Sequence, residues 1–226
     1  MNGFFLIDKE QEWTSSDVVC KLRGVLHEKK IGHAGTLDPM ATGLLIVLVG
    51  KGTKSSDEIM GHDKEYVASL RLGIRTDTQD IWGKVISTND SGSIGAEKLD
   101  EALAHFTGEI QQLPPMYSAV KVKGKKLYEI ARRGGEVERE PRTVRVSSIE
   151  PLGRDGEDWI LRINCSSGTY IRTLCNDIGE FLGCGGCMTA LRRTKIGNAR
   201  VEDAHKIGEI TDFTYVVPLE DKDNLL

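Results

Sequence analysis

Several features that would assign this chain to a familiar class of protein are missing from it. Its 226 residues contain no apolar run near the roughly 20 residues that a membrane-spanning helix needs, which excludes a helical membrane protein. No basic segment followed by a signal-length apolar stretch stands at the N-terminus, so we expect a cytoplasmic protein. The absence of internal repeats and low-complexity tracts excludes solenoid arrays.

Cysteine and nucleotide-binding motifs also set limits. The five cysteines are an odd number, which does not favour a disulfide framework. Cys184 and Cys187 have metal-ligand spacing, but no second CxxC and no pair of histidines stands nearby to complete a tetrahedral site. The stretch GKGT at 50–53 lacks the upstream glycine of a P-loop, and no GxGxxG follows a strand. We therefore expect reduced thiols and no metal.

The chain has no overall excess of positive charge. A net charge of −4 and a pI of about 5.8 argue weakly against nucleic-acid binding. Between Lys121 and Arg145, however, nine basic residues stand against four acidic ones, an excess of five (nine minus four). Such a run is most often a solvated surface, but it also has the charge that an arm contacting phosphates needs.

The composition, 39% hydrophobic and 28% charged, predicts a globular protein with one core and at most a small appendage. The segment 117–142 has few core-type residues and is predicted to be an arm or inserted hairpin with a short helix. Strands separated by helices at unequal spacing predict an α+β fold, with a mixed, largely antiparallel central sheet flanked by helices. The expected strands are 3–7, 44–49, 66–72, 143–149 and 159–164. One helix is expected directly after Thr14, a second over 96–106 and a third over 169–182.

The most informative stretch is IGHAGTLDPMATGLL, residues 31–45, which we expect to be a loop leading into a strand. It places one carboxylate, Asp38, among glycines that let the backbone approach a ligand closely. Pro39 stiffens the turn and biases Asp38 toward an extended conformation. An isolated Asp-Pro is usually only a turn, so the whole stretch carries the argument.

Six segments in the same order resemble one family. They are GFFLIDKEQEWTSSDVV, GHAGTLDPMATGLL, DKEYVASLRLGIRTDTQD, PPMYSAVKVKGKKLYEIARRG, CSSGTYIRTLCNDIGEFLG and MTALRRTKIG. Together they closely resemble the TruB family of tRNA pseudouridine synthases. The resemblance implies the pseudouridine synthase fold and isomerisation of a uridine in the T loop of tRNA to pseudouridine. Because this isomerisation involves no redox change, no hydrolysis and no external group, we expect no cofactor.

The resemblance also assigns roles to the residues of the active site. Asp38 is the expected catalytic carboxylate, acting on a flipped-out nucleotide either by covalent addition or by removing a ribose proton. Arg172 matches the arginine that pairs with this acid; without the resemblance, a helix-surface ion pair is the simpler interpretation. Tyr66 matches the tyrosine that stacks on the target base, and Tyr170 and Leu191 match residues lining the uracil pocket. As bare residues, these three would be assigned to the core.

Other matching residues are expected to hold RNA or support the site. His33 matches a histidine that helps hold the RNA, and Lys9 matches a lysine supporting the active site, although a solvated surface lysine is an equal alternative. Asp77 and Asp80 are expected to form a structural turn rather than a metal site. The segment 117–142 corresponds to the RNA-clasping insertion, whose expected contacts with the RNA backbone are Lys121, Lys123, Lys125, Lys126, Arg132 and Arg133.

The expected organisation is one catalytic domain over 1–220 and a short acidic tail over 221–226. The family's usual C-terminal RNA-binding domain is not expected, which predicts weaker and more salt-sensitive RNA binding. We expect a monomer that acts on the T stem-loop of tRNA without an obligatory protein partner. Two alternatives remain: the same reaction on another RNA, as in guide-RNA complexes, and a tRNA-binding or folding module with vestigial catalysis.

Overall fold

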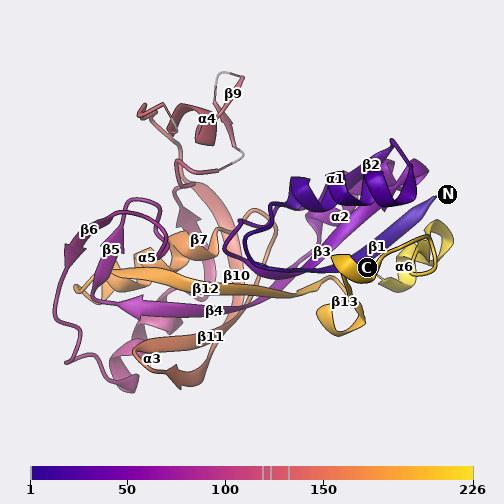
Figure 1. Cartoon of the computed structure of the whole chain (residues 1–226). Coiled ribbons are helices and arrows are strands. Elements are labelled where there is room, and N and C mark those ends of the chain that lie inside the picture. Colours follow the sequence, from indigo (N-terminus) through magenta and orange to yellow (C-terminus); the bar gives the residue numbers. More distant parts are fainter. Residues whose placement is uncertain (1, 119, 123, 132, 226) are drawn as a thin grey trace. The chain divides into compact units, whose positions relative to one another are not determined.

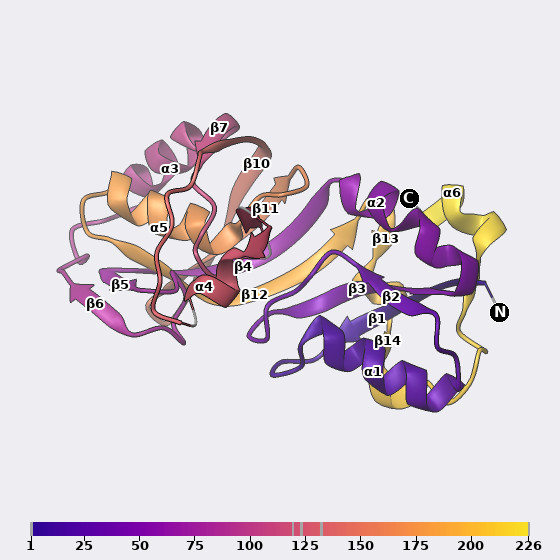
Figure 2. The same ribbon diagram turned by 90° about the horizontal axis from the view of Figure 1, so that it is seen from above.

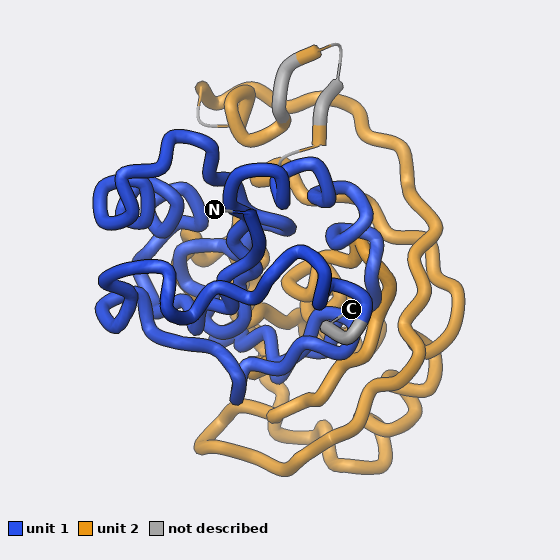
Figure 3. The backbone as a smooth tube through the Cα atoms, turned by 90° about the vertical axis from the view of Figure 1, so that its right-hand side faces the viewer, with its two compact units in different colours: residues 1–67, 190–226 blue, residues 68–189 orange. Residues whose placement is uncertain are grey.

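The structure is a computed structural model that describes residues 2–118, 120–122, 124–131 and 133–225. The chain divides into two compact units, residues 1–67 with 190–226 (unit 1) and residues 68–189 (unit 2). Figures 1 and 2 show the labelled elements in two views, and Figure 3 colours the two units. The chain passes between the units within β4 (Lys64–Leu72) and β12 (Gly186–Ile196).

Unit 1 is built around β3 (Thr42–Val49), whose sequence TGLLIVLV is buried from Gly43 onwards. A continuous apolar run of this kind is typical of a strand covered on both faces. β3 pairs antiparallel with β1 (Gly3–Lys9) and β2 (Ile31–Ala34), and parallel with β12. The main core cluster of this unit contains Phe4, Leu6, Ala34, Leu44, Ile46, Leu48, Ile59, Ile196, Ala199 and Val201.

Helix α1 (Ser15–Leu26) lies beside β2 in unit 1 (Figure 2). It begins with a capping box, in which the Thr14 hydroxyl accepts from Asp17 N and the Asp17 carboxylate accepts from Thr14 N. Its inner face buries Val18 and Leu22. The smaller elements of unit 1 are η1 (Gly50–Ser55), α2 (Ser56–Gly61), β13 (Ala199–Arg200), η2 (Val201–Asp203), β14 (His205–Lys206), η3 (Ile207–Glu209), β15 (Val217–Pro218), η4 (Leu219–Asp221) and α6 (Lys222–Leu225).

Unit 2 contains strands in the order β4-β11-β10-β7. They are the end of β4, β11 (Asp158–Cys165), β10 (Arg142–Asp155) and β7 (Gly108–Gln112). Helix α3 (Ala96–His105) packs against β10 and against α5 (Ile171–Phe181). A β-carbon on Gly179 of α5 would lie 2.1 Å from the backbone nitrogen of Gly186, so α5 packs directly on the start of β12.

Two hairpins complete unit 2. β5 (Ile74–Thr76) pairs with β6 (Val85–Thr88), and β8 (Lys121–Val122) pairs with β9 (Lys125–Lys126) ahead of α4 (Leu127–Ala131). In Figure 1, β9 and α4 project from the strands β7 and β10 that precede and follow them in the chain. The prediction of an inserted hairpin with a short helix within 117–142 is confirmed.

The predicted fold class and the strongly periodic elements are confirmed. The prediction missed several strands, however, and made others shorter than they are in the structure. The segment 31–34 forms β2 rather than a loop. The sequence did not predict this strand, because Gly32 and His33 interrupt the apolar pattern. β10 extends to Asp155 rather than ending at residue 149, since bulges accommodate Pro151 and Gly153. The structure also contains α2, β5, β6, β7 and β12, which periodicity did not predict.

Candidate active site

The loop that carries Asp38 joins β2 to β3 in unit 1. Gly35 begins it with φ +83°, a conformation that suits glycine. The Ser15 hydroxyl, at the first residue of α1, accepts from Leu37 N at 2.9 Å and donates to Leu37 O at 3.3 Å. Pro39 O accepts from Glu12 N at 2.8 Å. The backbone on both sides of Asp38 is therefore held by the segment that leads into α1.

Arg193 of β12 fastens the same loop and was not predicted as a site residue. Its side chain is fully buried; Nε donates to Leu44 O at 2.7 Å and Nη2 donates to Gly35 O at 3.2 Å. Arg193 also lies opposite Gly43 in the parallel pairing of β12 with β3. A β-carbon on Gly43 would lie 2.3 Å from Arg193 O, so only glycine allows this approach.

Strand alternation offered a sequence signal for Arg193. Successive side chains of a strand point to opposite faces, so the pair Arg192-Arg193 must place one guanidinium on each face. Arg192 is partly exposed and binds both carboxylate oxygens of Asp8, each at 2.9 Å. Arg193 occupies the buried face, where it donates to the backbone carbonyls of Leu44 and Gly35.

Lys9, at the end of β1, is fully buried beside these charges. Its ammonium donates to Trp13 O at 2.6 Å and to Glu10 O at 3.0 Å. Burial lowers the pKa of Lys9 to about 8; the charge of Asp38 opposes this shift and that of Arg193 reinforces it. The alternative of a solvated surface lysine is therefore wrong, and Lys9 lies within electrostatic reach of Asp38.

The other predicted site residues of unit 1 are His33, Tyr66 and Leu191. His33 lies in β2 opposite Val47, and its buried Nδ1 has no hydrogen-bond partner among the described residues. Burial, together with the charge of Arg193, lowers the pKa of His33 below its ordinary value of 6.5, which favours the neutral imidazole at neutral pH. Tyr66 in β4 and Leu191 in β12 are both buried.

Two further predicted site residues, Tyr170 and Arg172, lie in unit 2, at the start of α5. Tyr170 N donates to the side-chain oxygen of Gln112 at 2.7 Å, and the Gln112 amide donates back to Tyr170 O at 3.1 Å. Arg172 is buried; Nη2 donates to Tyr117 O, and Nη1 lies 3.8 Å from the Asp80 carboxylate. The simpler interpretation of Arg172 as part of a helix-surface ion pair is wrong. Its expected pairing with Asp38 stays a prediction.

Asp80 belongs to a structural turn, as expected. Its Oδ1 accepts from the Thr78 hydroxyl at 2.9 Å and from Trp82 N at 3.1 Å, while Oδ2 faces Arg172. A turn of this kind fixes the carboxylate before any ligand binds. The link from Asp80 to Arg172 was not predicted, because the two residues lie far apart in the sequence.

The basic residues of the arm are only partly within the described chain. Lys121 lies in β8, Lys125 and Lys126 lie in β9, and Arg133 is exposed just after α4. Lys123 and Arg132 lie outside the described residues. Contact of this segment with RNA stays a prediction.

Metal binding finds little support among the described side chains. They contain no group of three or more His, Cys, Asp or Glu residues that could hold a metal ion. Burial raises the pKa of Cys187 to about 11 and raises that of Cys175 as well. Burial therefore favours the protonated thiol of both cysteines at neutral pH.

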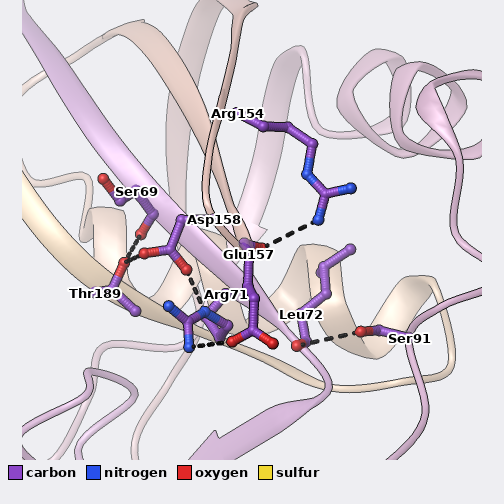
Figure 4. Close-up of polar contacts among 8 residues, drawn as sticks. All are labelled: Ser69, Arg71, Leu72, Ser91, Arg154, Glu157, Asp158 and Thr189. Atoms are coloured by element: carbon purple, nitrogen blue, oxygen red, sulfur yellow. Dashed lines mark hydrogen bonds and ion pairs between the residues drawn. The ribbon is translucent and has the colours of Figure 1, made fainter.

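A second polar cluster lies in unit 2 and contains none of the predicted site residues (Figure 4). Arg71 contacts Asp158 and lies 2.9 Å from the Glu157 carboxylate, while the Thr189 hydroxyl donates to Asp158 at 2.7 Å. These contacts tie β4, β11 and β12 together beside a hollow of about 530 Å³. Because Arg71 is already bound by two carboxylates, this cluster is a structural link.

Comparison with known proteins adds to this geometry. Residues 23–171 match the family model for the N-terminal domain of TruB family pseudouridylate synthases, and residues 172–226 match the tRNA pseudouridylate synthase B C-terminal domain. The chain therefore belongs to the TruB family of pseudouridylate synthases. The second match starts at Arg172 and includes α5 and β12, which lie within the single catalytic domain expected over 1–220.

Relatives match over most of the chain. A protein named tRNA pseudouridine synthase B from Endomicrobium trichonymphae is 50% identical over 90% of this chain and 89% of its own length. One of the same name from Clostridium tetani (strain Massachusetts / E88) is 46% identical over 97% of this chain and 77% of its own length. Among solved structures, a chain of a Cbf5-Nop10-Gar1 complex is 32% identical with a TM-score of 0.73. That match covers 92% of this chain and 53% of the Cbf5-complex chain, so this chain spans about half its length.

Across the described helices, none has the length and apolar character needed to span a membrane.

Proposed function

We propose that this chain isomerises a uridine in the T loop of tRNA to pseudouridine, with Asp38 as the catalytic carboxylate. The observation that carries the proposal is the Asp38 loop: Ser15 holds its backbone, Arg193 bonds both of its ends, and Lys9 lies buried nearby. A binding module would not need a carboxylate held beside buried cations. The family membership gives the chemistry that such a carboxylate performs.

The reaction conserves the atoms of the nucleotide. The bond between N1 of the uracil and C1′ of the ribose breaks, the base rotates, and a bond forms between C5 and C1′. The hydrogen of C5 leaves as a proton, and N1 gains a proton. The target base must leave the stack to reach the carboxylate, and we assign stacking on it to Tyr66. Tyr170 and Leu191 are assigned to the uracil pocket, and His33 to the RNA.

An ionised Asp38 is required whether it adds to the nucleotide or removes a ribose proton. A carboxylate covered by a base loses solvation, which favours its neutral form. Nearby cations oppose that change, and Lys9 is one that acts on Asp38 within unit 1. Arg172 is assigned as the second cation, held by Asp80 and by the carbonyl of Tyr117.

tRNA is favoured over other RNAs as the substrate. The relatives named tRNA pseudouridine synthase B are 43–50% identical to this chain, whereas two chains of Cbf5 complexes are 29–32% identical. We further propose that the protein acts in the cytoplasm as a monomer and needs no protein partner.

The test uses a tRNA transcript labelled with tritium at uracil C5, because pseudouridine formation must release that label. We expect release by the wild type, none by Asp38→Asn, and none when only the T-loop uridine is replaced. The matched control is Asp90→Asn, which alters an exposed loop carboxylate of unit 2. A wild type that binds the transcript without releasing tritium would leave only a tRNA-binding module.

A further inference from the structure

We propose that the exposed basic end of α1, formed by Arg23, His27, Lys29 and Lys30, is a contact surface for the phosphate backbone of the RNA substrate. All four residues are exposed. Three permanent cations stand against one acid, Glu28, for a local charge of +2 (three minus one), on a chain whose net charge is −4. The partner rests on the proposed function, and the surface is separate from the arm at 117–142.

The cations of this surface are not paired with carboxylates of the described chain, although Arg23 Nη2 donates to Ile31 O at 2.7 Å. Among the described residues, no ion pair includes Arg23, Lys29 or Lys30, whereas many other cations on this chain, such as Arg71, Arg192 and Lys222, pair with carboxylates. The local acid is directed to the backbone, because the Glu28 carboxylate accepts from Lys30 N at 2.9 Å. Exposed cationic side chains that form no ion pair within the described part of the protein suit a ligand of the opposite charge.

The local backbone gathers these side chains. Arg23 lies in the last turn of α1, and the C-cap residue His27 has a left-handed conformation, φ 50°, that turns the chain at the helix end. Arg23, His27, Glu28 and Lys29 line a hollow of about 460 Å³. The favourable interaction of cations with a helix C-terminus fades beyond the last turn, so it does not explain Lys29 and Lys30.

The position in the chain selects RNA as the occupant. Lys30 immediately precedes β2, which carries His33 and leads into the Asp38 loop (Figure 2). On an extended strand, Lys30 and His33 are at most about 10 Å apart between their Cα atoms. Because His33 is assigned to the RNA, phosphates beside its contact are placed within reach of Lys30. Phosphate contacts by lysine and arginine add affinity that falls as salt is raised.

The test reverses two charges that lie outside the catalytic machinery. The variant Lys29→Glu/Lys30→Glu is compared with Lys84→Glu/Lys98→Glu, which makes the same charge change at exposed lysines of unit 2. Fluorescence anisotropy with a labelled tRNA transcript measures the Kd, and tritium release measures KM and kcat. For the first variant we expect Kd and KM to rise on the order of tenfold at about 50 mM salt, with kcat unchanged.

The salt dependence supplies a second readout. Loss of two phosphate contacts makes the slope of log K against log salt shallower by about 1.5, while the control keeps the wild-type slope. Lys29→Ala/Lys30→Ala, which removes the charges without adding acids, should show the same direction with a smaller rise in Kd. Equal effects in the variant and its control, or an unchanged Kd in both lysine variants, would overturn the proposal. Binding is measured by anisotropy and the reaction by tritium release. A protein that releases no tritium can therefore still confirm or refute the proposed phosphate contacts.

Discussion

At the scale of single residues, the candidate site depends on charged side chains that are buried with partners. Lys9 and Arg193 bond backbone carbonyls, and Arg172 bonds a carbonyl beside a carboxylate. Buried polar groups need such partners, because an unpaired one loses its hydration without compensation. Substitution of any of these residues should therefore affect both the stability of the fold and the proposed reaction, and both can be measured.

Lys9 predicts a distinct dependence of stability on pH. Its pKa is about 8 in the folded chain, against an ordinary value of 10.5, so between these values the unfolded chain binds more protons. The free energy of unfolding should therefore rise with pH across this window, by about 3 kcal/mol in total. Urea unfolding of the wild type and Lys9→Met at pH values from about 7.5 to 10.5 measures the difference. Parallel profiles for the two proteins would contradict the buried charge.

Arg172 predicts a loss of stability that a surface arginine does not share. Arg172→Met leaves the carboxylate of Asp80 without its buried cation, for which we expect a loss of about 3 kcal/mol. The control Arg162→Met breaks an exposed pair with Glu150 and should cost less than about 1 kcal/mol. Urea unfolding compares them, and equal losses would show that the Asp80 contact contributes little.

At the scale of elements, the Asp38 loop is held by the close approach of β12 to β3. Gly43 has φ +98° and faces the backbone of Arg193, so the parallel pairing allows no side chain there. The two hydrogen bonds of the Arg193 guanidinium then span the loop from Gly35 to Leu44. The geometry of the loop is thus set by a strand more than 140 residues further along the chain.

Gly43→Ala should destabilise the fold, since the added β-carbon meets backbone atoms and the residue must keep a left-handed conformation. We expect a loss of at least about 2 kcal/mol together with lost tritium release. Gly24→Ala is the matched control: it lies within α1 with open space around it, and it should gain up to about 1 kcal/mol. Thermal unfolding distinguishes the two, and a stable, active Gly43→Ala protein would refute the close approach.

Arg193→Lys should separate positioning of the loop from its charge. The lysine keeps the cation but not the planar guanidinium that bonds two carbonyls in different directions. We expect kcat to fall on the order of 100-fold, with KM nearly unchanged, because displacement of Asp38 affects the chemical step. Arg192→Lys, on the other face of the strand, should change kcat only a few-fold. Equal kcat values for the two variants would argue against a positioning role.

At the scale of the whole molecule, the distribution of charge matters more than its sum. A body with a net charge of −4 has local positive segments at the end of α1 and within the arm. We predict that the protein is a monomer of 24.9 kDa by sedimentation and that tRNA binding depends steeply on salt. Five phosphate contacts would give a slope of log K against log salt between about −3.5 and −4.5. A slope near zero would contradict binding through these segments.

The sequence by itself determined the family, the fold class and the strongly periodic elements, because apolar spacing, capping residues and the Asp38 stretch are local signals. It also indicated Asp38, Arg172, Tyr66 and Lys9 as site residues through resemblance, and these assignments stay predictions. Strands without apolar alternation, such as β2 and β12, were missed, since their pairing partners lie elsewhere in the chain.

Only the tertiary structure decided which charges are buried and what they contact. The sequence alone does not distinguish an exposed lysine or arginine from a buried one, because burial depends on the elements that pack over the residue. The two carbonyl bonds of Arg193 and the approach of Asp80 to Arg172 join segments that are distant in sequence. The local sequence does not predict these contacts, because they form only when strands and helices pack together.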